Sequence, residues 1–369
     1  MAVAVGSAAQ TTINVPADVA TIQGAIDVAN NGDTVLVAPG TYTENLDFKG
    51  KAITVVSASG AAATIIDGGQ KAPVVQFVTN EPATAVLDGF TIRDGLESFG
   101  MGGGVKIRNS APTVRNNVIR DNTGCNMSAV YLGGSSATIA SNVISNNGDL
   151  GTGCSGGSGA GIYVGGSRSN GPNIIVGNQI VNNTAKNGEG GGVALNGAGN
   201  VVFQNNLVKG NSAYDTGGIW IINSVSELIV GNVIVDNVSA LANNRQVSGV
   251  YLSVPYNSRG AYLLNNTISS GAQTGNAVYI AGYYSATPLT NNIIFGNNSD
   301  ATVHCDPVYS SQPPLFSHND LYSPLANAYE GTCGAVLGNN GNISAAPLFM
   351  DLAGGNYRLQ PTSPAIDAG

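Results

Sequence analysis

Charged residues are scarce in this chain of 369 residues, where Asp, Glu, Lys and Arg together make up 10 %. The balance is acidic, with a formal net charge of −8, and this argues against nucleic acid or an anionic membrane surface as a partner. No apolar run reaches the roughly 18 residues that a membrane span needs, so the sequence predicts no such span. A hydrophobic content of 43 %, arranged in short alternating β-branched runs, excludes a disordered chain and predicts strands.

Histidine and cysteine are also rare, with two and four residues. Neither His304 nor His318 has a partner at the HxxxH or HExxH spacing, which excludes the common helical zinc sites. None of the cysteines stands in a C-x-x-C pair, so the sequence contains no zinc-ribbon or dithiol redox motif.

What the chain has in abundance is a repeat. An asparagine followed two positions later by an apolar residue recurs seven times, at intervals of 25 to 36 residues. A second asparagine follows five residues after six of these, and Gly271 takes its place in the remaining copy. A constant core with variable inserts predicts a stacked solenoid. The first set is Asn117, Asn142, Asn178, Asn206, Asn232, Asn266 and Asn292, and the second is Asn122, Asn147, Asn183, Asn211, Asn237 and Asn297.

The repeat predicts an all-β, right-handed parallel β-helix of about ten coils that forms a single domain over residues 1–369. Each coil is expected to supply three short strands that pair with the coils above and below, since winding one coil gives parallel strands their long return path. We expect residues 1–50 to be a leader and cap, 51–306 the coils, and 307–369 the last coils and a closing segment. Inward positions are apolar, and the Asn side chains should stack as ladders along the axis with no role as ligands. The expected inward pairs include Val130/Leu132, Ile162/Val164, Ile219/Ile221 and Val250/Leu252.

The N-terminal region predicts one short helix. Val19, Ile22, Ile26 and Ala29 recur at helical spacing before an Asn-Asn-Gly-Asp stop. Such a helix would plug the open end of the solenoid core.

The four cysteines predict two disulfides. Cys125 and Cys154 follow the second asparagine in consecutive repeats, so stacking brings them together, and Cys305 and Cys333 remain as the other pair. Disulfides indicate an oxidising compartment; four buried free thiols are the alternative. The small residues of MAVAVGSAAQTT are typical of the end of a cleaved export signal. Together with the disulfides, they predict a mature secreted protein, extracellular or periplasmic, with an added Met. We expect the protein to be a monomer.

Three stretches resemble known proteins. Residues 15–69, VPADVATIQGAIDVANNGDTVLVAPGTYTENLDFKGKAITVVSASGAAATIIDGG, resemble the opening of secreted parallel β-helix proteins of the pectate-lyase-like superfamily, and also the start of pectin methylesterases. From Gly103 onward the repeats resemble the generic right-handed β-helix type. The end, NISAAPLFMDLAGGNYRLQPTSPAIDAG, is similar to the closing segment of large bacterial extracellular β-helix proteins, which implies a domain cut from a longer chain. The Asp-Asp and Gly-His-Gly signatures of polygalacturonases and the Gln-Asp-Thr-Leu-Tyr step of pectin methylesterases are missing.

Aligning the strand after each glycine pair predicts an outward stripe that begins at a cation and continues through aromatic residues. An exposed aromatic row suits a sugar polymer, because rings stack on the apolar faces of sugars. The alternative is a ladder that only stabilises the sheet through cross-strand contacts. The stripe is Lys106, Tyr131, Tyr163, Ala194, Trp220, Tyr251 and Tyr279.

The candidate chemistry lies near the start of this stripe. The resemblance implies a substrate groove over this sheet, and β-elimination of a uronide needs a cation for the carboxylate, a base and an acid. Lys106 and Arg108 are the clustered cations and are candidate catalytic residues, with Lys106 as a candidate base, and the nearby Arg93 is a candidate substrate-binding residue. Glu189 and Asp215 are candidate catalytic acids, and Asp94 and Glu97 are candidate calcium ligands.

Three functions are therefore considered. The favoured one is a lyase acting on an acidic polysaccharide, and the second is a non-catalytic glycan-binding or structural surface protein. The third is a glycosidase that uses two of Asp94, Asp121, Glu189 and Asp215.

Overall fold

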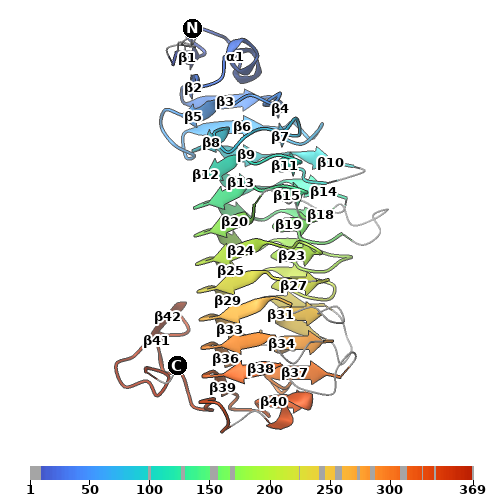
Figure 1. Cartoon of the computed structure of the whole chain (residues 1–369). Coiled ribbons are helices and arrows are strands. Elements are labelled where there is room, and N and C mark those ends of the chain that lie inside the picture. The colour runs from blue at the N-terminus through green and yellow to red at the C-terminus, as the bar shows by residue number, and fades with distance from the viewer. Residues whose placement is uncertain are drawn as a thin grey trace, which may run out of the picture.

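The molecule is a parallel β-solenoid whose coils stack from one end of the chain to the other (Figure 1). The computed structural model describes residues 10–98, 101–125, 129–149, 157–166, 171–223, 225–240, 246–253, 260–271, 275–282, 287–307, 314–325, 327–335 and 338–367. Within these residues, three long sheets of eleven or twelve strands run along the axis, which agrees with the about ten coils predicted. A fourth, shorter sheet was not predicted.

Each complete coil passes through sheets A, B, D and C in that order. Sheet A contains β1 (Thr12–Val15), β2 (Thr34–Val37), β5 (Thr54–Ser57), β8 (Val86–Asp88), β12 (Thr113–Arg115), β16 (Thr138–Ala140), β20 (Asn173–Val176), β24 (Val201–Gln204), β28 (Leu228–Val230), β32 (Tyr262–Leu264), β35 (Pro288–Thr290) and β38 (Leu315–Ser317). Sheet B contains β3 (Gly40–Thr43), β6 (Thr64–Asp67), β9 (Thr91–Arg93), β13 (Val118–Arg120), β17 (Val143–Ser145), β21 (Gln179–Val181), β25 (Leu207–Lys209), β29 (Val233–Val235), β33 (Thr267–Ser269), β36 (Ile293–Phe295) and β39 (Asp320–Tyr322).

The other two sheets complete the coil. Sheet C contains β4 (Leu46–Asp47), β7 (Val75–Phe77), β11 (Val105–Arg108), β15 (Val130–Gly133), β19 (Ile162–Gly165), β23 (Val193–Asn196), β27 (Ile219–Ile222), β31 (Val247–Ser253), β34 (Asn276–Ala281), β37 (Val303–Asp306) and β40 (Tyr329–Gly331). Sheet D contains β10 (Leu96–Glu97), β14 (Thr123–Gly124), β18 (Gly148–Asp149), β22 (Thr184–Ala185), β26 (Ser212–Ala213) and β30 (Val238–Ser239).

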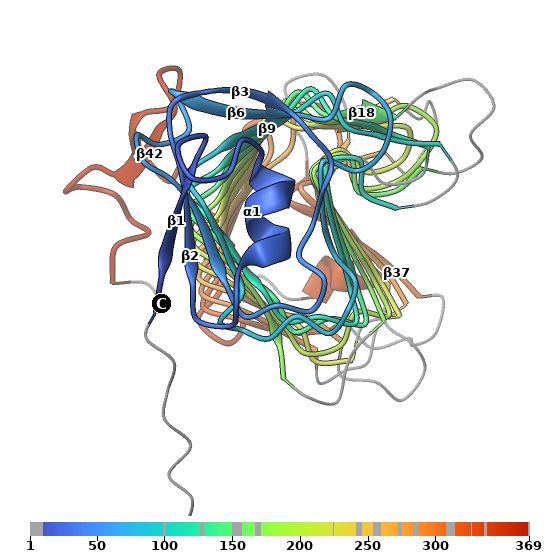
Figure 2. The same cartoon turned by 90° about the horizontal axis from the view of Figure 1, so that it is seen from above.

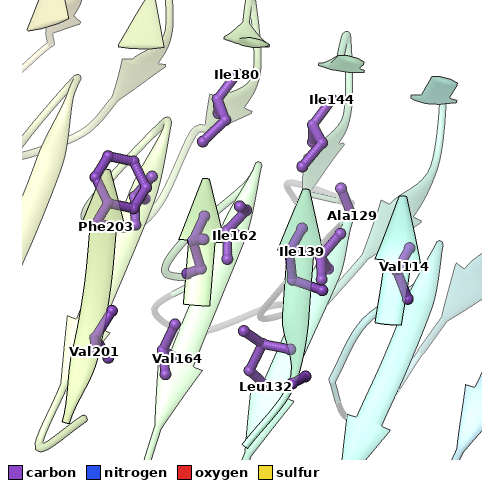
Figure 3. Close-up of a cluster of buried hydrophobic side chains, with 14 of the residues drawn as sticks. Val114, Ala129, Leu132, Ile139, Ile144, Ile162, Val164, Ile180, Val201 and Phe203 are labelled. Atoms are coloured by element: carbon purple, nitrogen blue, oxygen red, sulfur yellow. The ribbon is translucent and has the colours of Figure 1, made fainter. Parts of the chain in front are cut away.

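The core is a column of apolar side chains inside the coils. Figure 3 shows part of it, where side chains from successive coils, such as Ile144 and Ile180, point into the same interior. The predicted inward residues, among them Val130, Leu132, Ile219 and Ile221, have no exposed surface.

The predicted capping helix is present as α1 (Ile22–Val28). The Thr21 side chain accepts a hydrogen bond from the Gly24 amide, 3.1 Å away, which satisfies one of the free amides at the helix start. Ile22, Ala25 and Ile26 are fully buried. Seen along the axis, α1 lies across the open end of the coils (Figure 2).

The predicted asparagine ladder lies at the turn between sheets A and B and is longer than expected. Each Oδ1 accepts from both the backbone amide and the Nδ2 of the preceding asparagine, at 2.8–3.1 Å. Asn319 and Asn342 extend the first set, so nine asparagines form one ladder. The residues before the first eight have positive φ, a conformation that Gly and Asn adopt at low cost.

The second ladder, at the turn between sheets B and D, ends earlier than predicted. Its asparagines from Asn122 to Asn237 bond in the same way. Placing Asn297 in this ladder was wrong, because its amide bonds to the Ser270 hydroxyl instead, and the neighbouring Asn298 is the buried residue that bonds to Gly271 and Gly275.

The last described residues, 338–367, form a closing segment that folds back along sheet B. It contains the hairpin of β41 (Phe349–Asp351) and β42 (Asn356–Leu359), which stands beside the lower coils (Figures 1 and 2). Phe349 packs against Phe295, with ring centroids 5.0 Å apart, and the Tyr357 hydroxyl donates to Asp236 over 3.2 Å. The hairpin therefore reaches a coil about 120 residues earlier in the chain.

One predicted disulfide is confirmed. Cys305 and Cys333 are bonded, with Cα atoms 5.2 Å apart, and both are fully buried. Cys125 is disulfide-bonded too, but its predicted partner, Cys154, lies outside the described residues. Among the helices of the described ranges, none is both long and apolar enough to cross a membrane.

Candidate functional site

The outward residues of sheet C stand in one unbroken row. The strand register aligns the predicted stripe as expected and extends it by two residues at each end. We call the following row the sheet C stripe: Asp47, Gln76, Lys106, Tyr131, Tyr163, Ala194, Trp220, Tyr251, Tyr279, His304 and Glu330.

The rings of the stripe form two stacks on either side of Ala194. Tyr131 lies parallel to Tyr163, with centroids 5.8 Å apart. On the other side, Tyr279 lies between Tyr251, at 5.8 Å, and His304, at 4.5 Å.

The five predicted sugar-contacting aromatic residues differ in exposure. Tyr131, Tyr251 and Tyr279 expose 6–7 % of their surface, whereas Tyr163 and Trp220 are half-buried. Tyr163 and Trp220 therefore present more ring surface to a ligand. The proposed contact of all five with sugar stays a prediction.

Two glycines allow the first stack to lie flat on the sheet. A Cβ atom at Gly165 would come within 2.5 Å of Tyr163 Cε1, and one at Gly133 would overlap the Tyr131 hydroxyl. Because both positions lack a side chain, each ring can lie over the backbone of its own strand, above the glycine two residues further along. Burial raises the pKa of both hydroxyls, and the Arg108 charge partly opposes this for Tyr131.

The cationic end of the stripe is held by an ion pair. Lys106 Nζ lies 3.1 Å from Glu97 Oε2, which comes from the neighbouring strand β10 of sheet D. Arg108, two residues further along β11, is exposed. A fixed ammonium beside an exposed guanidinium can attract an anionic group.

Arg93 and Asp94 lie away from the stripe. Arg93 belongs to sheet B, where it pairs with Asp67 at 2.9 Å and with Asp94 at 3.3 Å. Asp94 and Glu97 are thus each neutralised by a different cation. The described part of the chain contains no group of three His, Cys, Asp or Glu that could hold a metal ion. The calcium site predicted for Asp94 and Glu97 stays a prediction.

Glu189 and Asp215 lie in the loops that lead from sheet D into sheet C, in consecutive coils. Glu189 accepts a hydrogen bond from the Ser158 hydroxyl at 2.9 Å. Asp215 is 2 % exposed and its amide bonds to the Gly188 carbonyl. Asp121, considered for a hydrolase, pairs with Arg120 at the turn between sheets B and D. Their catalytic roles stay predictions.

The other end of the stripe carries a group of polar side chains that the sequence did not suggest. His304 Nδ1 lies 3.3 Å from Glu330 Oε2, and the Tyr279 hydroxyl donates to Asp306 Oδ2 over 3.1 Å. The strand V-H-C of Val303–Cys305 has the alternation of the earlier copies, which could have revealed His304. It lacks the glycine that directly precedes most of those copies, however.

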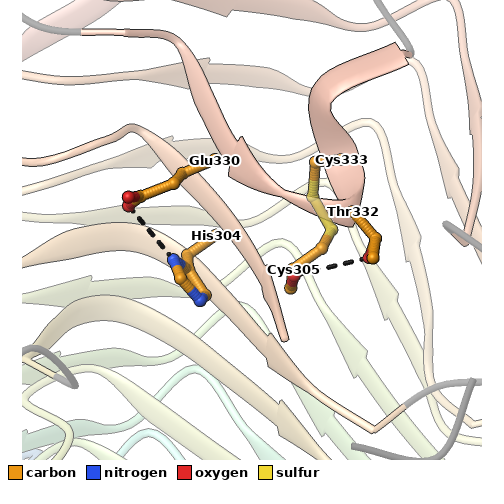
Figure 4. Close-up of a disulfide and its surroundings, with 5 residues drawn as sticks. All are labelled: His304, Cys305, Glu330, Thr332 and Cys333. Atoms are coloured by element: carbon orange, nitrogen blue, oxygen red, sulfur yellow. Dashed lines mark hydrogen bonds and ion pairs between the residues drawn. A yellow bond between two sulfur atoms is a disulfide. The ribbon is translucent and has the colours of Figure 1, made fainter. Parts of the chain in front are cut away.

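The Cys305–Cys333 disulfide lies on the core side of the strands that carry His304, Asp306 and Glu330. Cys305 points into the core between the outward residues His304 and Asp306, and its partner Cys333 follows Glu330 by three residues. Figure 4 shows the His304–Glu330 contact beside the disulfide. The bond therefore ties the two segments that supply His304, Asp306 and Glu330.

The chain is similar to known proteins in its repeats and in its fold. The family model described as "Right handed beta helix region" matches residues 60–238 and 103–294. No curated protein sequence matches the chain. Among solved structures, the chain is similar to ORF18 of Geobacillus virus E2, at 15 % identity and a TM-score of 0.41, over 84 % of this chain and 55 % of that one.

Two further solved structures are similar at the same level. One is a mannuronic acid specific polysaccharide family 6 lyase from human gut microbiota, at 11 % identity and a TM-score of 0.44, over 87 % of this chain and 83 % of that one. The other is an alginate lyase from Paenibacillus sp. str. FPU-7, at 17 % identity and a TM-score of 0.39, over 87 % and 98 %.

Proposed function

The chain belongs to the right-handed β-helix family, and from this premise we propose that it binds an extended acidic polysaccharide along the sheet C stripe and cleaves it by β-elimination. The observation that carries the proposal is the unbroken register of the stripe, which leads from a cationic end through stacked aromatic rings.

The shape of the stripe suits a polymer. Strands stack about 4.8 Å apart, so the seven strands from Lys106 to Tyr279 span roughly 29 Å. Tyr163 and Trp220 offer part of their ring surface along this length, and rings of this kind stack on the apolar faces of sugars. A site of this length supports binding of a chain rather than of a single sugar.

The cations favour an acidic polymer. Arg108 is exposed and lies beside the ion-paired Lys106, so a uronate carboxylate can approach both. These two cations can attract the carboxylates of such a chain and hold the polymer on the stripe.

The location proposed for the protein is outside the cytoplasm. The Cys305–Cys333 disulfide and the bonded Cys125 suit an oxidising compartment, where polysaccharide substrates of this size are also found.

A panel of uronate polymers tests this function. The purified protein is incubated with each polymer, and the ultraviolet absorbance of the unsaturated product is followed together with new reducing ends. We expect both signals to rise together on at least one polymer. New reducing ends without ultraviolet absorbance would indicate hydrolysis and overturn the lyase proposal.

The second candidate is non-catalytic binding of glycan. The observation that favours it is the ring surface of Tyr163 and Trp220, which can stack on sugars without any catalytic group. In that case polymers retard the protein in a gel, but no polymer is cleaved.

A further inference from the structure

The end of the stripe that carries His304 has the groups that a proton-transfer reaction needs. The Tyr279 ring is covered on one face by Tyr251 and on the other by His304, so contact with a ligand is left to its edge, where the hydroxyl lies. Resting on the function proposed above, we propose that Tyr279 and His304 form the reaction centre, while Lys106 and Arg108 hold the polymer at the other end.

His304 supplies the group that meets the uronate carboxylate. Its Nδ1 donates to the Glu330 carboxylate, and Glu330 is itself held by the strand that pairs with β37. With Nδ1 fixed in this way, the imidazole turns Nε2 toward the sugar, and a proton on Nε2 would be donated to the uronate carboxylate. Glu330 is a positioning residue, since it acts through the imidazole.

Tyr279 supplies the proton transfer. Its hydroxyl donates to Asp306, so a carboxylate stands ready to take the phenol proton at 3.1 Å. The phenol oxygen then acts as base and acid on the same side of the sugar ring.

The reaction balances without a co-reactant. The phenol proton passes to Asp306 while the phenol oxygen takes the C5 proton of the uronate. The electron pair of the C5–H bond forms the C4–C5 double bond, and the C4–O bond breaks. The leaving oxygen takes the proton from Tyr279, and Asp306 returns its own proton to the phenol.

The two ends of the stripe then have separate tasks. Tyr279 lies six strands beyond Lys106, a distance of roughly 29 Å, so one sugar cannot contact both. Variants at the cationic end should therefore change affinity, and variants at Tyr279 or His304 should change turnover.

Tyr279→Phe and His304→Gln test the assignment on a polymer that the wild-type protein cleaves. Each should lower kcat by about 100-fold or more, because a positioned proton-transfer group contributes about that factor. Retardation in gels that contain the same polymer should stay within about twofold of wild type. Tyr262→Phe on sheet A and His318→Gln at the turn between sheets A and B are matched controls, and both should keep wild-type turnover.

The outcomes separate this inference from the function on which it rests. If no uronate polymer is cleaved by the wild-type protein, the lyase function fails and this centre fails with it. If the wild type cleaves and Tyr279→Phe keeps its turnover, the centre is refuted while the lyase function stands. Loss of activity through misfolding is recognised by unfolding temperature, which should match wild type for Tyr279→Phe.

Discussion

The imidazole of His304 lies nearly parallel to the phenol ring of Tyr279, with centroids 4.5 Å apart and an interplanar angle of 9°. The contact joins the last aromatic residue of the predicted stripe to a histidine that sequence reasoning left out. It also makes the C-terminal end of the stripe chemically different from the cationic end, where Lys106 pairs with Glu97.

Removing the disulfide beneath this contact should loosen it. A double Cys305→Ser, Cys333→Ser variant releases a link between residues 28 apart, which should cost about 3–4 kcal/mol of unfolding free energy. Denaturant unfolding under non-reducing conditions measures the loss. Addition of a reductant should lower the unfolding free energy of the wild type more than that of the variant, which no longer has this bond to lose. A variant as stable as wild type under non-reducing conditions would contradict the anchoring role.

The asparagine ladder should be a main source of stability. In Asn206→Ala, the Asn178 amide and Nδ2 lose their acceptor, and the Ile175 carbonyl and Asn232 Oδ1 lose a donor. Asn178 Nδ2 keeps its bond to the Ile139 carbonyl, and Asn232 Oδ1 keeps the bond from the Asn206 amide. The Asn178 amide and the Ile175 carbonyl lose their bonds at about 1–3 kcal/mol each, so we expect a total loss of roughly 2–6 kcal/mol. Asn205→Gly is the control, because Asn205 is exposed and has a φ of 53° that glycine adopts freely. Equal stability of the two variants would show that the ladder is incidental.

Asp320 should make stability depend on pH. Burial raises its pKa from the ordinary 3.8 to about 6, and its Oδ2 has no hydrogen-bond partner among the described residues. The folded state then binds the proton more tightly than the unfolded state, so unfolding free energy falls as pH rises from about 4 to about 6, by about 3 kcal/mol.

Asp320→Asn removes this dependence. The variant should be more stable than wild type at pH 7.5 and should lose the advantage below pH 4, as measured by denaturant unfolding at both values. A constant difference across the range would contradict the account. Because Oδ1 accepts from the Ala345 amide in the closing segment, hydrogen exchange there should report the same change.

Charge at the cationic end should control affinity. Arg108→Gln removes an exposed guanidinium, so affinity for a uronate polymer should fall about two- to fivefold at low salt. The difference should vanish at high salt, where exposed charges are screened. Gel retardation at both salt concentrations measures it, and a salt-independent difference would point to lost packing instead.

The sequence repeat predicted those parts of the fold that depend on residues within one coil. The register of Tyr131, Tyr163 and Trp220 followed from the apolar–aromatic–apolar pattern of their strands, and α1 followed from its apolar spacing. His304 was missed because Thr302 stands where most of the earlier copies have a glycine directly before the strand. The closing segment could not be placed from sequence, since the contact of Tyr357 with Asp236 joins residues 121 apart and depends on side chains from different coils.

The single tryptophan of the chain, Trp220, lies in the middle of the sheet C stripe and reports directly on whether a glycan occupies it. Uronate oligosaccharides are titrated into the protein while the emission of Trp220 is followed, and their affinity is measured independently by calorimetry. We predict a saturable change in emission whose midpoint equals the calorimetric dissociation constant. Binding detected by calorimetry with no change in the emission of Trp220 would place the glycan elsewhere and contradict the proposed site.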